Sequence, residues 1–263
     1  MSQNNPLSAI LDKQDFLLLD GAMATELEAR GCNLADSLWS AKVLVENPEI
    51  IREVHLDYYR AGAQCAITAS YQATPAGFAA RDLDEAQSKA LIGKSVELAR
   101  KAREAYLAEN PQAGTLLVAG SVGPYGAYLA DGSEYRGDYQ RSAEEFQAFH
   151  RPRVEALLDA GADLLACETL PNFAEISALA ELLTAYPRAR AWFSFTLRDS
   201  EHLSDGTPLA QAVALLDRCP QAVALGVNCI ALEKVTPALT ALRRLTCKPL
   251  LVYPNSGEQY DAV

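Results

Sequence analysis

A short apolar run followed by a polar loop and a helical stretch recurs from one end of this 263-residue chain to the other. Runs such as Leu116-Leu117-Val118-Ala119 are hydrophobic without interruption, which is typical of parallel strands buried on both faces. Seven such strands are predicted: Phe16–Asp20, Cys65–Ser70, Leu116–Ser121, Asp163–Glu168, Ala191–Thr196, Ala222–Asn228 and Pro249–Pro254. Their alternation with helical stretches predicts right-handed βαβ units and a parallel sheet.

The stretches between these runs carry signals for helix starts. Capping residues with a following proline or an acid three positions on are found at five places: Asn47-Pro48, Ser142 with Glu145, Asn172 with Glu175, Thr207-Pro208 and Thr236-Pro237. We therefore expect a helix to begin at each of these places.

The number of repeats leaves two architectures open. The length suits the roughly 250 residues of an eight-fold β/α barrel, but only seven β/α units are visible before Val263. The chain is thus either an open, doubly wound sheet or a barrel that lacks its last unit. Because no linker or shift in composition interrupts it, we expect residues 1–263 to form one domain, incomplete at its C-terminal end if it is a barrel.

Charge and composition exclude several classes of partner. The net charge of −11, from 34 acidic and 23 basic residues, repels phosphate backbones, so nucleic acid is not an expected partner. No stretch approaches the roughly 20 apolar residues of a membrane span, and the polar N-terminus has no apolar signal region, which predicts a cytoplasmic protein. Six cysteines are too few for a disulfide scaffold in a chain this long. The oligomeric state stays open.

Polar residues at the carboxyl ends of barrel strands are the default candidates for an active site. The predicted ends are Asp20, Ser70, Ser121, Glu168, Thr196, Asn228 with Cys229, and Asn255. The carboxylates of Asp20 and Glu168 are suited to binding an ammonium group, holding a metal or acting as bases, and a salt bridge or a helix cap is the structural alternative. For Cys229 the alternative is a small buried hydrophobe.

The remaining candidates are weaker. The three histidines are not spaced as metal ligands, and His55 and His150 are expected to be surface or packing residues within helices. Trp39 and Trp192 are expected in the core. No glycine-rich phosphate-binding fingerprint is present, and a Ser-His-Asp triad is not recognisable.

Six short motifs at these strand ends occur in one order along the chain. They are Asp20-Gly21-Ala22-Met23-Ala24-Thr25-Glu26-Leu27, Thr68-Ala69-Ser70-Tyr71, Gly120-Ser121-Val122-Gly123-Pro124-Tyr125-Gly126, Glu168-Thr169, Gly226-Val227-Asn228-Cys229 and Tyr253-Pro254-Asn255-Ser256-Gly257-Glu258. Together they resemble the homocysteine S-methyltransferases of bacteria, which take a methyl group from S-methylmethionine or S-adenosylmethionine.

The resemblance implies a (β/α)8 TIM-type barrel of which this chain shows seven of eight units. It also implies zinc-dependent methyl transfer from a sulfonium donor to the thiol of homocysteine, giving methionine. Cys229 would be the first zinc ligand. The family's other two zinc cysteines belong to a Gly-Gly-Cys-Cys motif that this sequence lacks, so we expect an incomplete zinc site and a chain that, as written, is inactive or nearly so.

The same resemblance assigns substrate contacts. Glu168 and Asp20 would bind the ammonium of homocysteine, with Asn228 and Ser70 as polar neighbours. Tyr71, or a tyrosine of the loop 125–139, would pack against the sulfonium by cation–π attraction, unless the loop tyrosines pack on themselves. No general acid or base is expected, because the donor loses its positive charge on transfer.

Two other functions stay open. One is a non-catalytic relative that binds amino acids after losing its zinc site. The other is an unrelated barrel enzyme, such as an aldolase or synthase, that uses Asp20 and Glu168.

Overall fold

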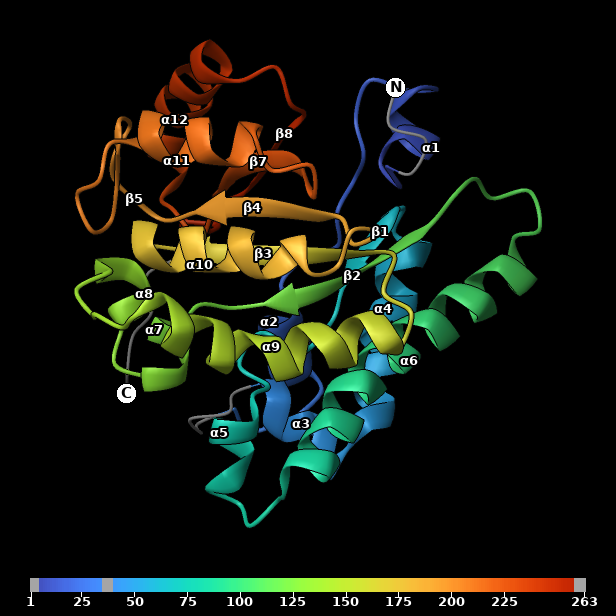
Figure 1. Cartoon of the computed structure of the whole chain (residues 1–263). Helices are drawn as coiled ribbons and strands as arrows, with labels where there is room; N and C mark the ends of the chain where they lie inside the picture. Colours follow the sequence, from blue (N-terminus) through green and yellow to red (C-terminus); the bar gives the residue numbers. More distant parts are fainter. Residues whose placement is uncertain (1–4, 35–39, 258–263) are drawn as a thin grey trace. The chain divides into compact units, whose positions relative to one another are not determined.

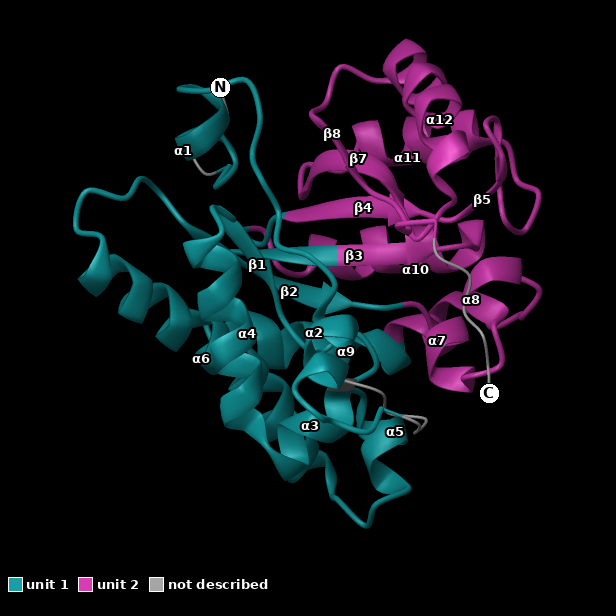
Figure 2. Ribbon diagram, turned by 180° about the vertical axis from the view of Figure 1, so that it is seen from behind, with its two compact units in different colours: residues 1–123, 148–166, 188–190 teal, residues 124–147, 167–187, 191–263 magenta. Residues whose placement is uncertain are grey.

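The computed structural model describes residues 5–34 and 40–257 (Figure 1). The chain divides into two compact units, coloured separately in Figure 2. Unit 1 comprises residues 1–123, 148–166 and 188–190, and unit 2 comprises residues 124–147, 167–187 and 191–263. The expectation of one domain stays a prediction. Trp39 and Glu258 lie outside the described residues.

Most helices of unit 1 precede its second strand. Its elements are α1 (Ser8–Leu11), α2 (Met23–Ala29), α3 (Ser40–Glu46), α4 (Pro48–Arg60), β1 (Cys65–Ile67), α5 (Pro75–Ala79), α6 (Glu85–Glu109), β2 (Leu117–Val122), most of α9 (Ala143–Asp159) and the start of β3 (Leu164–Leu170). Helices α4 and α6 pack together, and the buried Tyr59 hydroxyl of α4 donates to the carbonyl of Leu117 at 2.8 Å. This contact fixes α4 to the start of β2.

Unit 2 alternates strands and helices. It holds α7 (Tyr125–Leu129), α8 (Ser133–Arg136), the rest of β3, α10 (Phe173–Thr184), β4 (Ala191–Phe195), β5 (Leu197–Asp199), β6 (His202–Leu203), α11 (Leu209–Asp217), β7 (Ala222–Asn228), α12 (Leu232–Leu245) and β8 (Leu250–Tyr253). Both α11 and α12 pack against β7. The small antiparallel pair β5–β6 was not predicted by the apolar runs.

The main sheet decides between the two architectures. Its six strands lie in the order β1-β2-β3-β4-β7-β8, and the pairs β1–β2, β4–β7 and β7–β8 are parallel. Strand order therefore follows chain order throughout, whereas a doubly wound sheet reverses its order at a switch point. This is the progression of a TIM-type β/α barrel, as the resemblance implied. All six strands overlap predicted ones.

Two sequence expectations need correction. The segment Phe16–Asp20 forms only an isolated parallel bridge from Leu19 to Cys65, and Phe16 is 69% exposed. It pairs at one point rather than along a ladder, so it is not a regular strand. Helix α12 begins at Leu232, which places Pro237 inside the helix rather than at its start. The cap at Asn172 and the reciprocal Ser142–Glu145 bonds are confirmed.

Close strand packing in unit 2 requires a glycine in β7. Gly226 lies opposite Leu251 of β8, and a Cβ at position 226 would lie 2.0 Å from the Leu251 carbonyl oxygen. No side chain fits there, so β7 and β8 approach more closely than two ordinary residues allow.

Within the described residues, no helix is both long enough and apolar enough to cross a membrane.

Candidate functional site

The predicted site residues are distributed over both units. Glu168, Asn228 and Cys229 belong to unit 2. Glu168 lies within β3, which continues to Leu170 beyond the predicted end, while Asn228 ends β7 and Cys229 follows it. Asp20, Ser70 and Tyr71 belong to unit 1.

In unit 2, the Glu168 carboxylate is held by a tyrosine. The Tyr253 hydroxyl at the end of β8 donates to Glu168 Oε2 at 2.8 Å. The indole N–H of Trp192 donates to the same hydroxyl at 3.3 Å, and Ser194 Oγ lies 2.9 Å from it. Glu168 is only 7% exposed. Burial, and then the negative Glu168, raise the pKa of Tyr253 well above its ordinary value, so the phenol keeps its proton as a donor.

The same network continues to Cys229. Ser194 Oγ lies 2.7 Å from Asn228 Oδ1, and Asn228 Nδ2 donates to Thr169 Oγ1 at 2.7 Å and to the Cys229 sulfur at 3.4 Å. The backbone N–H of Thr169 also donates to Asn228 Oδ1, at 2.8 Å. Unit 2 thus brings together the three site residues predicted on it.

Two of the four non-glycine residues that have a positive φ in the described part of the chain lie at this place. Thr169 (φ 60°) and Cys229 (φ 50°) both adopt the left-handed conformation, which is uncommon outside glycine and unusual for a β-branched residue. Each such residue costs about 1–2 kcal/mol. Strain of this kind persists only where surrounding contacts determine the conformation, and it clusters at functional sites.

The Cys229 thiol keeps its proton in these surroundings. Burial raises its pKa to about 11, and the negative charges of Glu168 and Glu134 act in the same direction, while the hydrogen bonds from Thr169 and Asn228 act against it. A thiol with this pKa is a weak nucleophile near neutral pH.

The donor set for zinc is incomplete in the described part of the chain. There, no group of three or more His, Cys, Asp or Glu side chains is placed to hold a metal ion. Structural and catalytic zinc sites take three or four such ligands. Cys229 alone therefore does not fit the three-thiolate site that the resemblance implies.

In unit 1, Asp20 lies beside a buried histidine. Its Oδ2 accepts the N–H of Ile67 at 2.8 Å and lies 3.9 Å from His55 Nδ1. His55 is fully buried, and neither ring nitrogen has a hydrogen-bond partner. Burial lowers the pKa of His55 to about 4, so the ring is neutral near pH 7. The expectation that His55 is a packing residue is confirmed, and the alternative that it lies at the surface is wrong.

Ser70 is bonded within unit 1. It is fully buried and donates to the Ser121 carbonyl at 2.8 Å, and its oxygen lies 2.7 Å from Thr68 Oγ1. These bonds hold the ends of β1 and β2 together. A role in substrate binding stays a prediction for this residue.

The loops after β1 and β2 are fixed by one buried arginine. Arg153, 1% exposed, donates to the Tyr71 carbonyl at 2.7 Å and to the Gly123 carbonyl at 2.5 Å. His150 Nδ1 lies 3.0 Å from the same guanidinium. Gly123 must be a glycine, because a Cβ there would lie 2.5 Å from the Tyr71 oxygen. The backbone around Tyr71 is therefore firmly held.

The tyrosine-rich loop of unit 2 packs on itself. Its centre is the buried Glu175, which accepts the Tyr139 hydroxyl and the backbone N–H of Tyr125, the latter at 2.6 Å. The rings of Tyr125 and Tyr139 also contact each other and Phe146. Tyr125 and Tyr139 therefore follow the expectation that the loop tyrosines pack on themselves.

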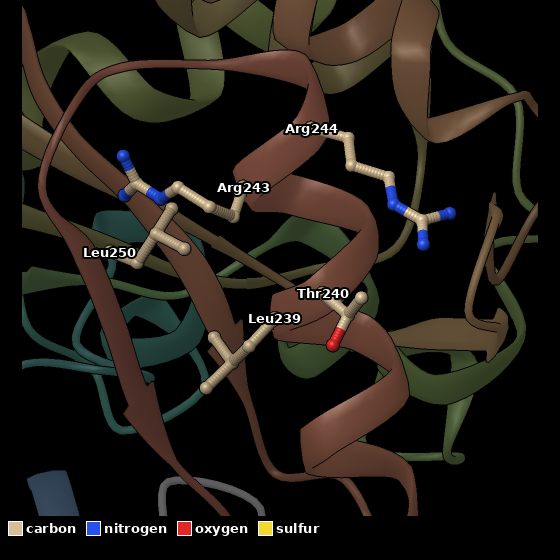
Figure 3. Close-up of a pocket in the computed structure, with 5 residues that line it drawn as sticks. All are labelled: Leu239, Thr240, Arg243, Arg244 and Leu250. Carbon is tan, nitrogen blue, oxygen red and sulfur yellow. The ribbon is translucent and has the colours of Figure 1, made fainter.

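Sequence reasoning missed Tyr253, Ser194, Trp192 and Arg153 as contributors to these arrangements. A polar Ser194 inside the buried run Ala191–Phe195 was an available signal. A surface hollow elsewhere in unit 2 is lined by Leu239, Thr240, Arg243, Arg244 and Leu250, between α12 and β8 (Figure 3). None of the predicted site residues lines it, so the hollow does not mark the candidate site.

Comparison with known proteins decides the family. The family model described as homocysteine S-methyltransferase matches residues 17–263. The homocysteine S-methyltransferase of Escherichia coli (strain K12) is 89% identical over 263 residues, which cover 100% of this chain and 85% of the relative. This chain belongs to the homocysteine S-methyltransferase family. The resemblance seen in the motifs is thereby confirmed, and the chain is a methyltransferase by family.

A further relative supports the family, and a solved structure supports the fold. Homocysteine S-methyltransferase YbgG of Bacillus subtilis is 55% identical over 98% of this chain and 82% of its own length. The crystal structure of the E. coli homocysteine methyltransferase MmuM in its metallated form matches with a TM-score of 0.95 and 88% identity, covering 96% of this chain and 88% of that one.

Proposed function

We propose that this chain binds homocysteine and a sulfonium methyl donor and transfers the donor's methyl group to the homocysteine thiol. The observation that carries the proposal is the unit 2 network that joins Glu168 to Cys229. It holds a carboxylate, which suits an ammonium group, in a fixed relation to a sulfur centre. Homocysteine carries an ammonium at one end and a sulfur at the other.

The proposed step needs orientation more than acid or base catalysis. The homocysteine thiol releases its proton to solvent water and its sulfur forms a bond to the methyl carbon, while the bond from that carbon to the sulfonium sulfur breaks. The donor sulfur keeps the electron pair and becomes a neutral thioether. Holding the two sulfurs in line is the main contribution the protein can make. S-Methylmethionine and S-adenosylmethionine are the two donors to test.

The other substrate contacts rest on the family resemblance. We propose Glu168, and Asp20 in unit 1, for the substrate ammonium. Asn228 and Ser70 are proposed as polar neighbours, and Tyr71 for the sulfonium.

Zinc enters the proposal through Cys229, its first proposed ligand. The solved E. coli relative described as metallated supports a metal in the family. Since the described residues include no group of three side chains placed to hold a metal ion, we propose that a polypeptide of these 263 residues holds zinc weakly and transfers methyl groups slowly. This same donor set favours the second candidate function, an amino-acid-binding protein without catalysis.

Three measurements on the purified 263-residue chain test the proposal. Calorimetry measures homocysteine binding, elemental analysis measures zinc per chain, and mass spectrometry follows methionine made from ¹³C-labelled homocysteine. The label separates this product from methionine released by the donor. The E. coli relative serves as the active control.

We expect homocysteine binding that weakens at least ten-fold in Glu168→Gln, with zinc well below one ion per chain and slow transfer. Absence of homocysteine binding would refute the proposed substrate. Methyl transfer as fast as that of the E. coli relative would refute the proposal that the lack of a three-ligand group makes transfer slow. Binding with no labelled product, even with added zinc, would establish the second candidate.

A further inference from the structure

The Tyr253 hydroxyl is the centre of the unit 2 network. It contacts Glu168 Oε2 at 2.8 Å, Ser194 Oγ at 2.9 Å and Trp192 Nε1 at 3.3 Å. Its partners come from β3 and β4, while Tyr253 ends β8. Ser194 is fully buried and Trp192 is 2% exposed, so neither partner is free to turn away.

The number of protons available fixes the direction of two of these three bonds. Trp192 has a donor and no acceptor, so its contact uses the Tyr253 oxygen as acceptor. A carboxylate at Glu168 only accepts, so the single phenolic proton of Tyr253 points at Glu168. Ser194 then directs its own proton to Tyr253 or to Asn228 Oδ1, which also accepts the Thr169 N–H. The donors of Trp192, Tyr253 and Ser194 therefore all have acceptors while Tyr253 donates to Glu168.

This arrangement restricts the carboxylate in a way that burial alone does not. A glutamate has three rotatable bonds, and a charge-assisted bond from a phenol that is itself held by two buried groups fixes one oxygen. Pre-organised charge binds a ligand without the cost of ordering the side chain on binding. The amino-acid end of a substrate would thus meet a carboxylate already in place.

We propose that Tyr253 is a positioning residue for the substrate's ammonium group, acting through Glu168 and held in turn by Trp192 and Ser194. This inference rests on the proposed function, because it takes Glu168 as the group that receives the ammonium of homocysteine. It adds that recognition of the amino group depends on a hydroxyl at the end of β8.

The test compares two ligands that differ only in the ammonium group. Homocysteine and 4-mercaptobutanoate share the thiol, the carbon chain and the carboxylate. Calorimetry gives the Kd of each for the unsubstituted chain, Tyr253→Phe and Ser194→Ala. In Tyr253→Phe we expect the Kd of homocysteine to rise about ten-fold, the size expected for one hydrogen bond to a charged group. The Kd of 4-mercaptobutanoate should change less than two-fold, and Ser194→Ala should give a smaller change in the same direction.

Tyr139→Phe is the matched control. It removes the same hydroxyl from another tyrosine that donates to a glutamate of unit 2, Glu175, outside the network. We expect it to lower stability and to leave the ratio of the two Kd values unchanged. Circular dichroism checks that each variant is folded, and if Tyr253→Phe does not fold, the ratio measured for Ser194→Ala decides.

The outcomes separate the inference from the proposed function. An unchanged ratio in the folded variants, or equal weakening of both ligands, would overturn the positioning role while leaving homocysteine as substrate. If the unsubstituted chain binds neither ligand, the proposed function fails and this inference fails with it.

Discussion

Replacing Arg153 by methionine tests how strongly one buried guanidinium stabilises unit 1. Methionine keeps most of the apolar volume but removes the donors to the Tyr71 and Gly123 carbonyls. A buried acceptor that loses its donor costs about 1–3 kcal/mol, so two acceptors give about 2–6 kcal/mol. Relief from burying the positive charge offsets part of this. We therefore expect a net loss of about 3 kcal/mol in the free energy of unfolding.

The loss is large enough to measure by urea unfolding followed by circular dichroism. For a chain of this size it corresponds to a midpoint lowered by about 1 M urea, or to a Tm lowered by about 6–12 °C. Hydrogen exchange should also speed up at the backbone amides that follow β1 and β2, because these loops lose their shared anchor.

Two further variants make the result interpretable. Arg153→Lys can still reach one carbonyl and should recover part of the loss. Arg60→Met removes an arginine that is half exposed and paired at the surface with Glu109, and its midpoint should stay close to that of the unsubstituted chain. The reasoning is wrong if Arg153→Met unfolds at the same urea concentration as the parent, or no earlier than Arg60→Met.

Two other predictions follow from the geometry. Gly226→Ala should give little folded protein in expression and solubility assays, since its Cβ would lie 2.0 Å from the Leu251 oxygen, whereas Gly114→Ala, with open space around it, should behave like the parent. His55 should make the chain less stable in acid: the unfolded state takes up a proton below pH 6.5, and the folded state does so only below about 4. Unfolding free energies at pH 7 and pH 5 should therefore differ by about 2 kcal/mol from this residue, and the difference should vanish in His55→Leu.

The strands were predictable from the sequence because burial on both faces leaves a continuous apolar run. All six strands of the main sheet overlap such runs. The exception, Phe16–Asp20, shows the limit of this signal: three consecutive leucines predict burial, yet Leu18 is 48% exposed. Helix starts with a capping side chain were predictable because the capping bonds are local in sequence, as at Asn172. Pro237 gave a wrong prediction because it lies inside α12 rather than at its start.

The partners of the site residues were not predictable from the sequence. Glu168 and Cys229 come at the ends of apolar runs in the sequence and carry recognisable chemistry, so both were predicted. The groups that hold them depend on which residues of separate strands meet, and this register is decided by packing such as that of Gly226 against Leu251. Arg153 could not be predicted for another reason. A charged residue within a helical stretch usually faces water, and only the fold shows that Arg153 is buried.

The left-handed backbone at Thr169 and Cys229 has an evolutionary consequence. At both positions, random mutation to glycine relieves the conformational cost, so selection for folding alone favours losing these side chains. Selection for a sulfur-handling site acts the other way. A lineage that has ceased to use the site should therefore lose threonine and cysteine here early, which makes these two codons an indicator of whether the ancestral chemistry is still being maintained.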